Sequence, residues 1–207
     1  MNARFTRLAS VSVSVLASIT ILAACSSATD GSSMGGTDMA SMSDSAGSGT
    51  PSAKSTSFND ADVTFVQSMI PHHAQAVELS DSLLSKSGIA PKMTELANQI
   101  KDAQAPEIEK MNGMLTSWGK KPVRAGSMSG MDGMVSPEDV QTFKDSAGFE
   151  AEKLFLTHMI AHHTGAIKMA QTEQASGKNP EAIALAKSVV SSQQAEVATM
   201  NSLLASL

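Results

Sequence analysis

The sequence contains one cysteine, no tyrosine and no Glu-x-x-His motif. A single cysteine cannot form a disulfide within the chain. The missing tyrosine removes one redox-active side chain, and the missing Glu-x-x-His removes the carboxylate–imidazole pair with which di-iron bundles hold their metal. No stretch shows the convincing alternation of apolar and polar residues that is typical of a strand. These absences exclude a disulfide scaffold and disfavour both a sheet protein and a di-iron enzyme.

Positive charge is also scarce once the N-terminal segment is set aside. Residues 1–24 combine Arg4 and Arg7 with an apolar run, as in a secretory signal. These are two of the 15 Lys and Arg side chains, so the remainder carries 13 against 20 Asp and Glu, a formal net charge of −7. This balance argues against nucleic acid or an anionic lipid surface as a partner, because both bind a basic face.

The only cysteine lies directly after this signal. Leu22-Ala23-Ala24-Cys25 has the form of a bacterial lipoprotein cleavage box, in which small residues precede a cysteine that takes a thioether-linked lipid. The box predicts an extracytoplasmic protein that is anchored to the bacterial cell membrane by lipid on Cys25. The apolar run is also long enough to leave an uncleaved anchor as an alternative, and an ordinary signal followed by a chance cysteine is another.

Two regions follow the signal. Residues 25–57 are mainly Ser, Gly, Thr, Ala and Asp with scattered methionines, and they cannot bury enough surface to offset the entropy of ordering, so we expect a flexible tether. Residues 58–207 are long enough for one domain, and their apolar residues recur with the period of a helix. Long helices are predicted at about 60–86, 91–118, 149–175 and 180–207, with a short helix that begins near Ser136.

An internal repeat organises this domain. Met69-Ile70-Pro71-His72-His73 recurs ninety residues later as Met159-Ile160-Ala161-His162-His163. The second and fourth long helices also match each other, with a shift of 89 residues. Each half is therefore a helical hairpin, and the predicted fold is all-α: a ferritin-like four-helix bundle built from two repeated hairpins, with a short extra helix in the crossover.

Each histidine pair lies on the buried face of its helix, three residues after a methionine. A thioether in the place of a carboxylate shifts preference from iron and manganese to Cu(I), while imidazole suits either copper state. The predicted copper ligands on the helices are Met69, His72, His73, His158, Met159, His162, His163 and Met169. The Gly/Ser-rich loop at about 120–135 adds Met128, Met131 and Met134, which are separated by Ser, Gly and Asp and suit Cu(I) more than Cu(II).

Other interpretations of these residues stay open. Methionines at helical spacing often only fill a core, as we expect for Met111 and Met200. Asp62 and Glu152 are interpreted as helix caps or as acceptors for imidazole N–H groups. Glu107 and Glu196, at matching places in the repeat, could hydrogen-bond the histidines or lie in solvent.

The two MIxHH helices, each followed by a Q-x-x-E-[IV]-x-x-M helix, resemble a bacterial family of ferritin-like bundles. That family is catalogued as a domain of unknown function, and some of its members are periplasmic copper-binding proteins. The resemblance covers residues 58–207 and is close in MIAHHTGAIKMA, whereas the first half departs from the pattern at Ser68 and Leu79. It implies a role in copper binding or copper resistance, usually without a catalysed reaction.

Three functional hypotheses follow. The first is a lipid-anchored protein that sequesters copper outside the cytoplasm and is not an enzyme. The second is a ferritin-like metal-dependent oxidase, which the missing carboxylate bridges disfavour. The third is a metal-free envelope protein whose bundle serves as an interaction module, with histidines held by core hydrogen bonds.

Overall fold

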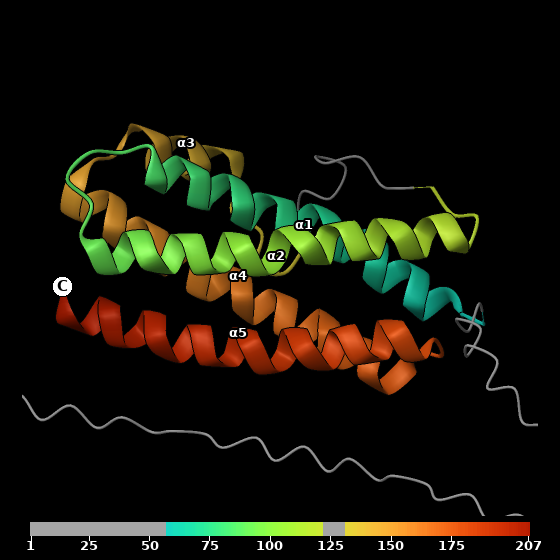
Figure 1. Ribbon diagram of the computed structural model, residues 1–207. Helices are drawn as coiled ribbons and strands as arrows, with labels where there is room; N and C mark the ends of the chain where they lie inside the picture. Colours follow the sequence, from blue (N-terminus) through green and yellow to red (C-terminus); the bar gives the residue numbers. More distant parts are fainter. Residues whose placement is uncertain (1–56, 122–130) are drawn as a thin grey trace, which may run out of the picture. The chain divides into compact units, whose positions relative to one another are not determined.

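Five helices form the part of the chain that the computed structural model describes, residues 57–121 and 131–207. They are α1 (Asp60–Leu84), α2 (Pro91–Ser117), α3 (Pro137–Asp145), α4 (Gly148–Ser176) and α5 (Pro180–Ser206) (Figure 1). The described residues contain no strand. The predicted all-α, ferritin-like bundle is confirmed, with helices close to their expected positions.

Local sequence sets where these helices begin. Asn59 and Asp62 form a capping box, in which each side chain accepts a hydrogen bond from the other residue's backbone N–H. Ser136 caps α3, and Asn179 caps α5 by accepting from two backbone N–H groups. Proline opens α2, α3 and α5, at a position where the missing N–H costs no helical hydrogen bond.

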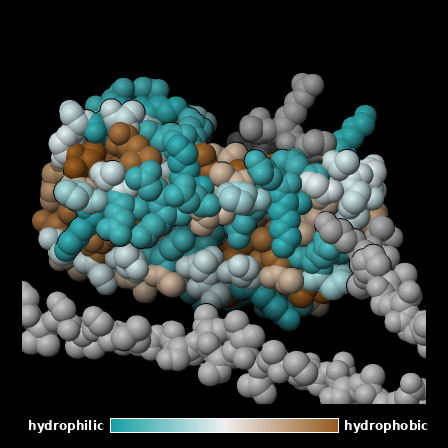
Figure 2. All heavy atoms as spheres, in the orientation of Figure 1, coloured by the Kyte–Doolittle hydropathy of each residue, from teal (hydrophilic) through white to brown (hydrophobic). Residues whose placement is uncertain are grey.

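The helices pack as two hairpins. Helix α1 lies along α2, α4 lies along α5, and α1 packs on α4 where the hairpins meet (Figure 1). Helix α3 belongs to the crossover and packs on α4. Figure 2 shows a mostly hydrophilic face, with hydrophobic side chains gathered toward the end of the bundle that carries the C-terminus and a smaller group in the other half.

The apolar core is divided into two clusters. In α1, Phe65 to Ile70 belong to the first cluster and Ala76 to Leu83 belong to the second. In α4 the order is reversed, so that Ala151 to Met159 lie in the second cluster while Ala166 and Ala170 lie in the first. The two helices therefore cross between the clusters, at the level of the paired histidines.

Several predicted features lie outside the described residues. These are the signal sequence, the lipidation site Cys25, the tether up to residue 56, and Met128. Among the helices that are described, none combines the length and the hydropathy that a membrane span requires.

Candidate metal centre

A layer of polar side chains separates the two apolar clusters. Its centre consists of His72 and His73 from α1 and His162 and His163 from α4, all fully buried. Gln104 from α2 and Gln193 from α5 are buried as well. We call these six residues, together with Glu107 and Glu196, the histidine layer. The repeat explains it, because each hairpin contributes the same four positions.

Two histidines of the layer are paired with glutamates. His73 Nε2 donates to Glu107 Oε2 at 2.7 Å, and His163 Nε2 donates to Glu196 Oε2 at 2.5 Å. Both glutamate side chains keep 20% of their surface exposed, so that water still solvates their charge from outside. The question that the sequence left open is answered: Glu107 and Glu196 hydrogen-bond the histidines.

These pairs determine which ring nitrogen is available. A carboxylate can only accept, so Nε2 of His73 and of His163 carries a proton, and in the neutral form of each ring the lone pair lies on Nδ1. Both Nδ1 atoms are buried and have no hydrogen-bond partner within the described residues. His72 repeats the pattern, because its Nε2 lies 3.4 Å from the carbonyl oxygen of Asp132 and its buried Nδ1 is unpartnered there too. Neither ring nitrogen of His162 has such a partner.

The two inner histidines face each other across the seam. The ring centroids of His72 and His162 are 3.8 Å apart, with the ring planes tilted by 40°. Burial lowers the pKa of His72 to about 3, with a smaller electrostatic contribution from the neighbouring His73. Burial and the neighbouring His72 lower the pKa of His162 well below its ordinary value. Both rings are therefore neutral near pH 7, the state in which imidazole binds metals.

The segment 131–135 covers the layer from the crossover side. Gly165 lets it lie directly on α4, because a Cβ at this position would be only 2.0 Å from the carbonyl oxygen of Asp132. On the other flank, the Gln75 side chain donates to the Val135 carbonyl at 2.9 Å and accepts from the Val135 N–H at 2.8 Å. These contacts hold the Asp132 carbonyl in place beside His72.

The predicted methionine ligands are distributed around this layer. Met69 and Met159 are fully buried, but Met69 belongs to the first apolar cluster and Met159 to the second. They therefore border the layer from opposite sides. Met131 and Met134 are partly buried in the segment that covers it.

Two other predicted ligands lie farther out. His158 is partly buried, one helical turn before His162. Met169 lines a separate cavity between α1 and α4, seven residues after His162 and hence about 10 Å along the helix. Across residues 57–121 and 131–207, no group of three or more His, Cys, Asp or Glu side chains is arranged to hold a metal ion. A site of three ligands in the layer would therefore need a donor of another kind, such as methionine sulfur.

Asp62 and Glu152 act as caps at the two ends of the bundle. Asp62 accepts from the backbone N–H groups of Lys178 and Asn179, at 3.0 and 2.8 Å. Glu152 accepts from the Ala90 N–H at 2.6 Å. The capping interpretation is confirmed, and each carboxylate ties one hairpin to the turn of the other.

Sequence reasoning missed the contacts of the segment 131–135. Gln75 and Gly165 occupy equivalent positions of the repeat, and this mismatch was the one available signal. A glutamine in α1 and a glycine at the matching position of α4 indicate that both helices contact a segment that occurs only once in the chain. The backbone carbonyl of Asp132 left no signal, because every residue has one.

Comparison with known proteins identifies relatives. A family model described as "Domain of unknown function (DUF305)" matches residues 62–204. A DUF305 fragment from Deinococcus radiodurans is 33% identical, with a TM-score of 0.67 over 72% of this chain and 98% of that chain. A DUF305 protein from Streptomyces coelicolor, named as a candidate secreted protein, is 30% identical, with a TM-score of 0.66 over 70% and 93%. No curated protein matches the chain.

Structures of CopM are also similar. Its Cu(I)-bound form is 29% identical, with a TM-score of 0.59 over 69% of this chain and 94% of CopM. Its Cu(II)-bound form is 27% identical, with a TM-score of 0.61 over 70% and 96%. Silver-bound forms of CopM match as well. Metal binding thus occurs among the structures that resemble this chain.

Proposed function

The chain belongs to the DUF305 family, and on that premise we propose that it is a lipid-anchored, extracytoplasmic protein that binds and sequesters copper. CopM supports the choice of metal, because it is described in Cu(I)-, Cu(II)- and silver-bound forms. The acidic balance of the chain favours a cation over an anionic partner.

One observation carries this proposal: the buried, unpartnered Nδ1 atoms of the histidine layer. Burying a polar atom without a hydrogen bond costs free energy, so an interior with several such atoms suits a partner that arrives later. Glu107 and Glu196 fix the tautomer by accepting from Nε2, an arrangement that metal-binding histidines commonly share. The pattern fits nitrogen ligands that are already oriented before metal enters.

The methionines support Cu(I) as the favoured state. Met69 and Met159 border the layer from its two sides, and a thioether is a soft ligand that selects Cu(I) over harder ions. The ligands proposed here are Nδ1 atoms of the layer histidines, at most two for each copper ion, with sulfur from these two methionines. Met131 and Met134, in the covering segment, would help to capture Cu(I).

Extracytoplasmic location and lipid attachment rest on the N-terminal sequence. The cleavage box Leu22–Cys25 supports anchoring, and the relative named as a candidate secreted protein supports export. Replacement of Cys25 by serine should move the protein from the membrane fraction to the soluble one, while the unchanged chain stays with the membranes.

A binding role is proposed here in preference to catalysis. In di-iron enzymes, carboxylates near the histidines bind and bridge the metals. The two carboxylates of the histidine layer, those of Glu107 and Glu196, are instead engaged with imidazole N–H groups. Their role is to orient the ligands.

The test is a competition titration of residues 26–207 with Cu(I) against a chelator of known affinity. The variant with His72, His73, His162 and His163 all replaced by alanine should lose tight binding. His158→Ala is the matched control, because it removes an imidazole from α4 outside the layer, and it should bind copper like the unchanged chain. Circular dichroism verifies that each variant is helical. If the fourfold variant still bound Cu(I) tightly, the copper site would not be in the histidine layer, and the assignment would be overturned.

A further inference from the structure

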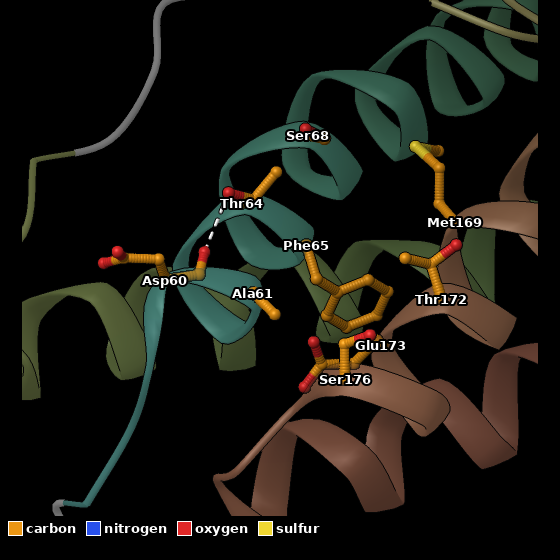
Figure 3. A pocket seen from close by; sticks show the side chains of 9 residues that line it. All are labelled: Asp60, Ala61, Thr64, Phe65, Ser68, Met169, Thr172, Glu173 and Ser176. Carbon is orange, nitrogen blue, oxygen red and sulfur yellow. Dashed lines mark hydrogen bonds between the residues drawn. The ribbon is translucent and has the colours of Figure 1, made fainter.

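A cavity of about 430 Å³ lies between the first half of α1 and the last half of α4 (Figure 3). Its apolar lining includes Ala61 and Phe65 from α1 and Met169 from α4. Hydroxyl and carboxyl groups complete the wall, among them those of Thr172 and Glu173. The cavity is separate from the histidine layer and plays no part in the proposed metal binding.

The repeat creates an equivalent groove at the other end of the bundle, and that groove is filled. The residues that match Phe65, Met169 and Glu173 are Phe155, Leu79 and Leu83. They belong to one apolar cluster with Phe143 of α3, which is fully buried. The Phe143 and Phe155 ring centroids are 6.1 Å apart. Helix α3 is therefore a short segment that occupies this second groove with an aromatic anchor.

A lysine holds α3 in its groove. Lys86 Nζ donates to the carbonyl oxygens of Lys144 and Ser146, each at 2.7 Å, just where α3 ends. The same ammonium lies 5.1 Å from the centroid of the Phe143 ring. The filled groove thus combines an apolar slot with a positive charge contributed by the bundle.

The open cavity has carboxyl groups where the filled groove has a lysine and a leucine. Ser176 stands at the position of Lys86, and Glu173 stands at the position of Leu83. Asp60 is also in the lining, whereas none of the described lining residues is a Lys or Arg. An occupant of the open cavity would therefore bring the positive charge itself.

Glu173 shows how far this wall departs from its apolar counterpart. Its side chain is 1% exposed, and the carboxyl group of Asp62 is its neighbour. Burial, with the adjacent Asp62, raises the pKa of Glu173 to about 8. A cationic group in the cavity would stabilise the ionised form of this carboxyl group.

We propose that the cavity is a docking site for a short amphipathic segment of a partner protein, with one large apolar anchor and basic residues beside it. The geometry of α3 in the equivalent groove supports the shape of this partner, and the exchange of Lys86 and Leu83 for Ser176 and Glu173 supports its charge. An amphipathic helix that lays its apolar face into a groove is a common mode of peptide recognition.

The probe is a peptide derived from α3 itself. One version carries residues 136–146 unchanged, and a basic version carries Glu138→Lys, Asp139→Lys and Asp145→Lys. Residues 26–207 are labelled with ¹³C on the methionine methyl groups, and the Met169 signal is assigned with Met169→Leu. The basic peptide should shift the Met169 signal in a saturable way, at least ~10-fold more tightly than the unchanged peptide. No shift, or equal shifts with both peptides, would overturn the proposal.

Two pairs of variants sharpen this test. Thr172→Trp places an indole in the cavity and should abolish the shift, whereas Thr157→Trp, at an exposed threonine elsewhere on α4, should leave it intact. Glu173→Leu copies Leu83 and should remove the preference for the basic peptide, with Glu173→Gln as the milder version. If the peptide binds only after residues 26–56 are deleted, the chain's own N-terminal segment is the occupant, and a separate partner is ruled out.

Discussion

The two hairpins, α1–α2 and α4–α5, share their central positions but differ on either side of them. Both supply a His-His pair, a glutamate that accepts from the second histidine, and a buried glutamine. They differ one turn before the histidine pair, at Ser68 and His158, and beyond it, at Leu83 and Glu173. The repeat is preserved in the histidine layer, to which both hairpins contribute. It has diverged where a hairpin contacts a segment that has no second copy, such as α3. The predictions that follow test this division.

The largest effect is expected when either hairpin loses its histidines. The double variants H72A/H73A and H162A/H163A should each weaken Cu(I) binding by more than ~100-fold, since changes to groups that only orient ligands already cost 10- to 100-fold. Competition titrations of the two variants give the affinities. If only one of the two double variants lost Cu(I) binding, a single hairpin would hold the metal. The two hairpins would then not contribute equally to the site.

The glutamates should have a smaller and equal effect. Glu107→Gln and Glu196→Gln each replace a charged acceptor by an amide that can donate instead, so the tautomer of the paired histidine is no longer fixed. We expect each change to weaken Cu(I) binding by about 10- to 100-fold. The matched control is Glu109→Gln, an exposed glutamate of α2, which should change nothing. A difference between the two glutamates larger than tenfold would mean that the hairpins contribute unequally.

The contacts of the covering segment, residues 131–135, should contribute to the free energy of unfolding of the metal-free protein. Gly165→Ala forces the segment away from α4, and overpacking of this kind costs about 1–3 kcal/mol. Gln75→Ala removes two hydrogen bonds to Val135, at about 1 kcal/mol each. Denaturant titration of metal-free protein measures both losses. Gly113→Ala is the control, because a Cβ there meets nothing within 4 Å.

The last prediction concerns pH and distinguishes the two ends of the bundle. The folded pKa of Glu173 is about 8, above its ordinary value of 4.5, so the folded state binds the extra proton between these values. The free energy of unfolding should therefore fall as pH rises from about 5 to 8, with no further loss from this group above that range. Glu173→Gln should flatten this fall in denaturant titrations. Hydrogen bonds from backbone N–H groups outweigh burial and lower the pKa of Asp62, which places its contribution below this window.

Much of the fold could be predicted because its determinants are local. The caps Asn59, Ser136 and Asn179 and the first-turn prolines are short-range signals, and helix ends follow from them. The repeat then fixed the architecture, because two copies of one amphipathic hairpin can bury their apolar stripes against each other. Because Glu107 and Glu196 occupy matching positions of the repeat, only two roles were expected for them: to hydrogen-bond the histidines or to lie in solvent.

The rest depends on geometry that a sequence does not carry. Helical spacing places Met169 on the same face as His162, yet Met169 lies two turns farther along α4 and lines the cavity there. The available nitrogen of His72 depends on a backbone carbonyl sixty residues along the chain. The repeat predicts a groove at each end of the bundle, but only the packing of α3 determines that one groove is filled and the other is open.

The seam between α1 and α4 has a consequence for assembly. Contacts between the hairpins are reciprocal: Asp62 of the first accepts from the turn of the second, and Glu152 of the second accepts from the turn of the first. His72 and His162, which match in the repeat, also face each other across the seam. Such reciprocity characterises the isologous interface of a twofold dimer. A single α1–α2 hairpin would thus hold half of the donors and would complete the set only with a second copy. The crossover that contains α3 joins the copies covalently and turns that association into an intramolecular one. The complete layer can therefore form in a single molecule at any dilution.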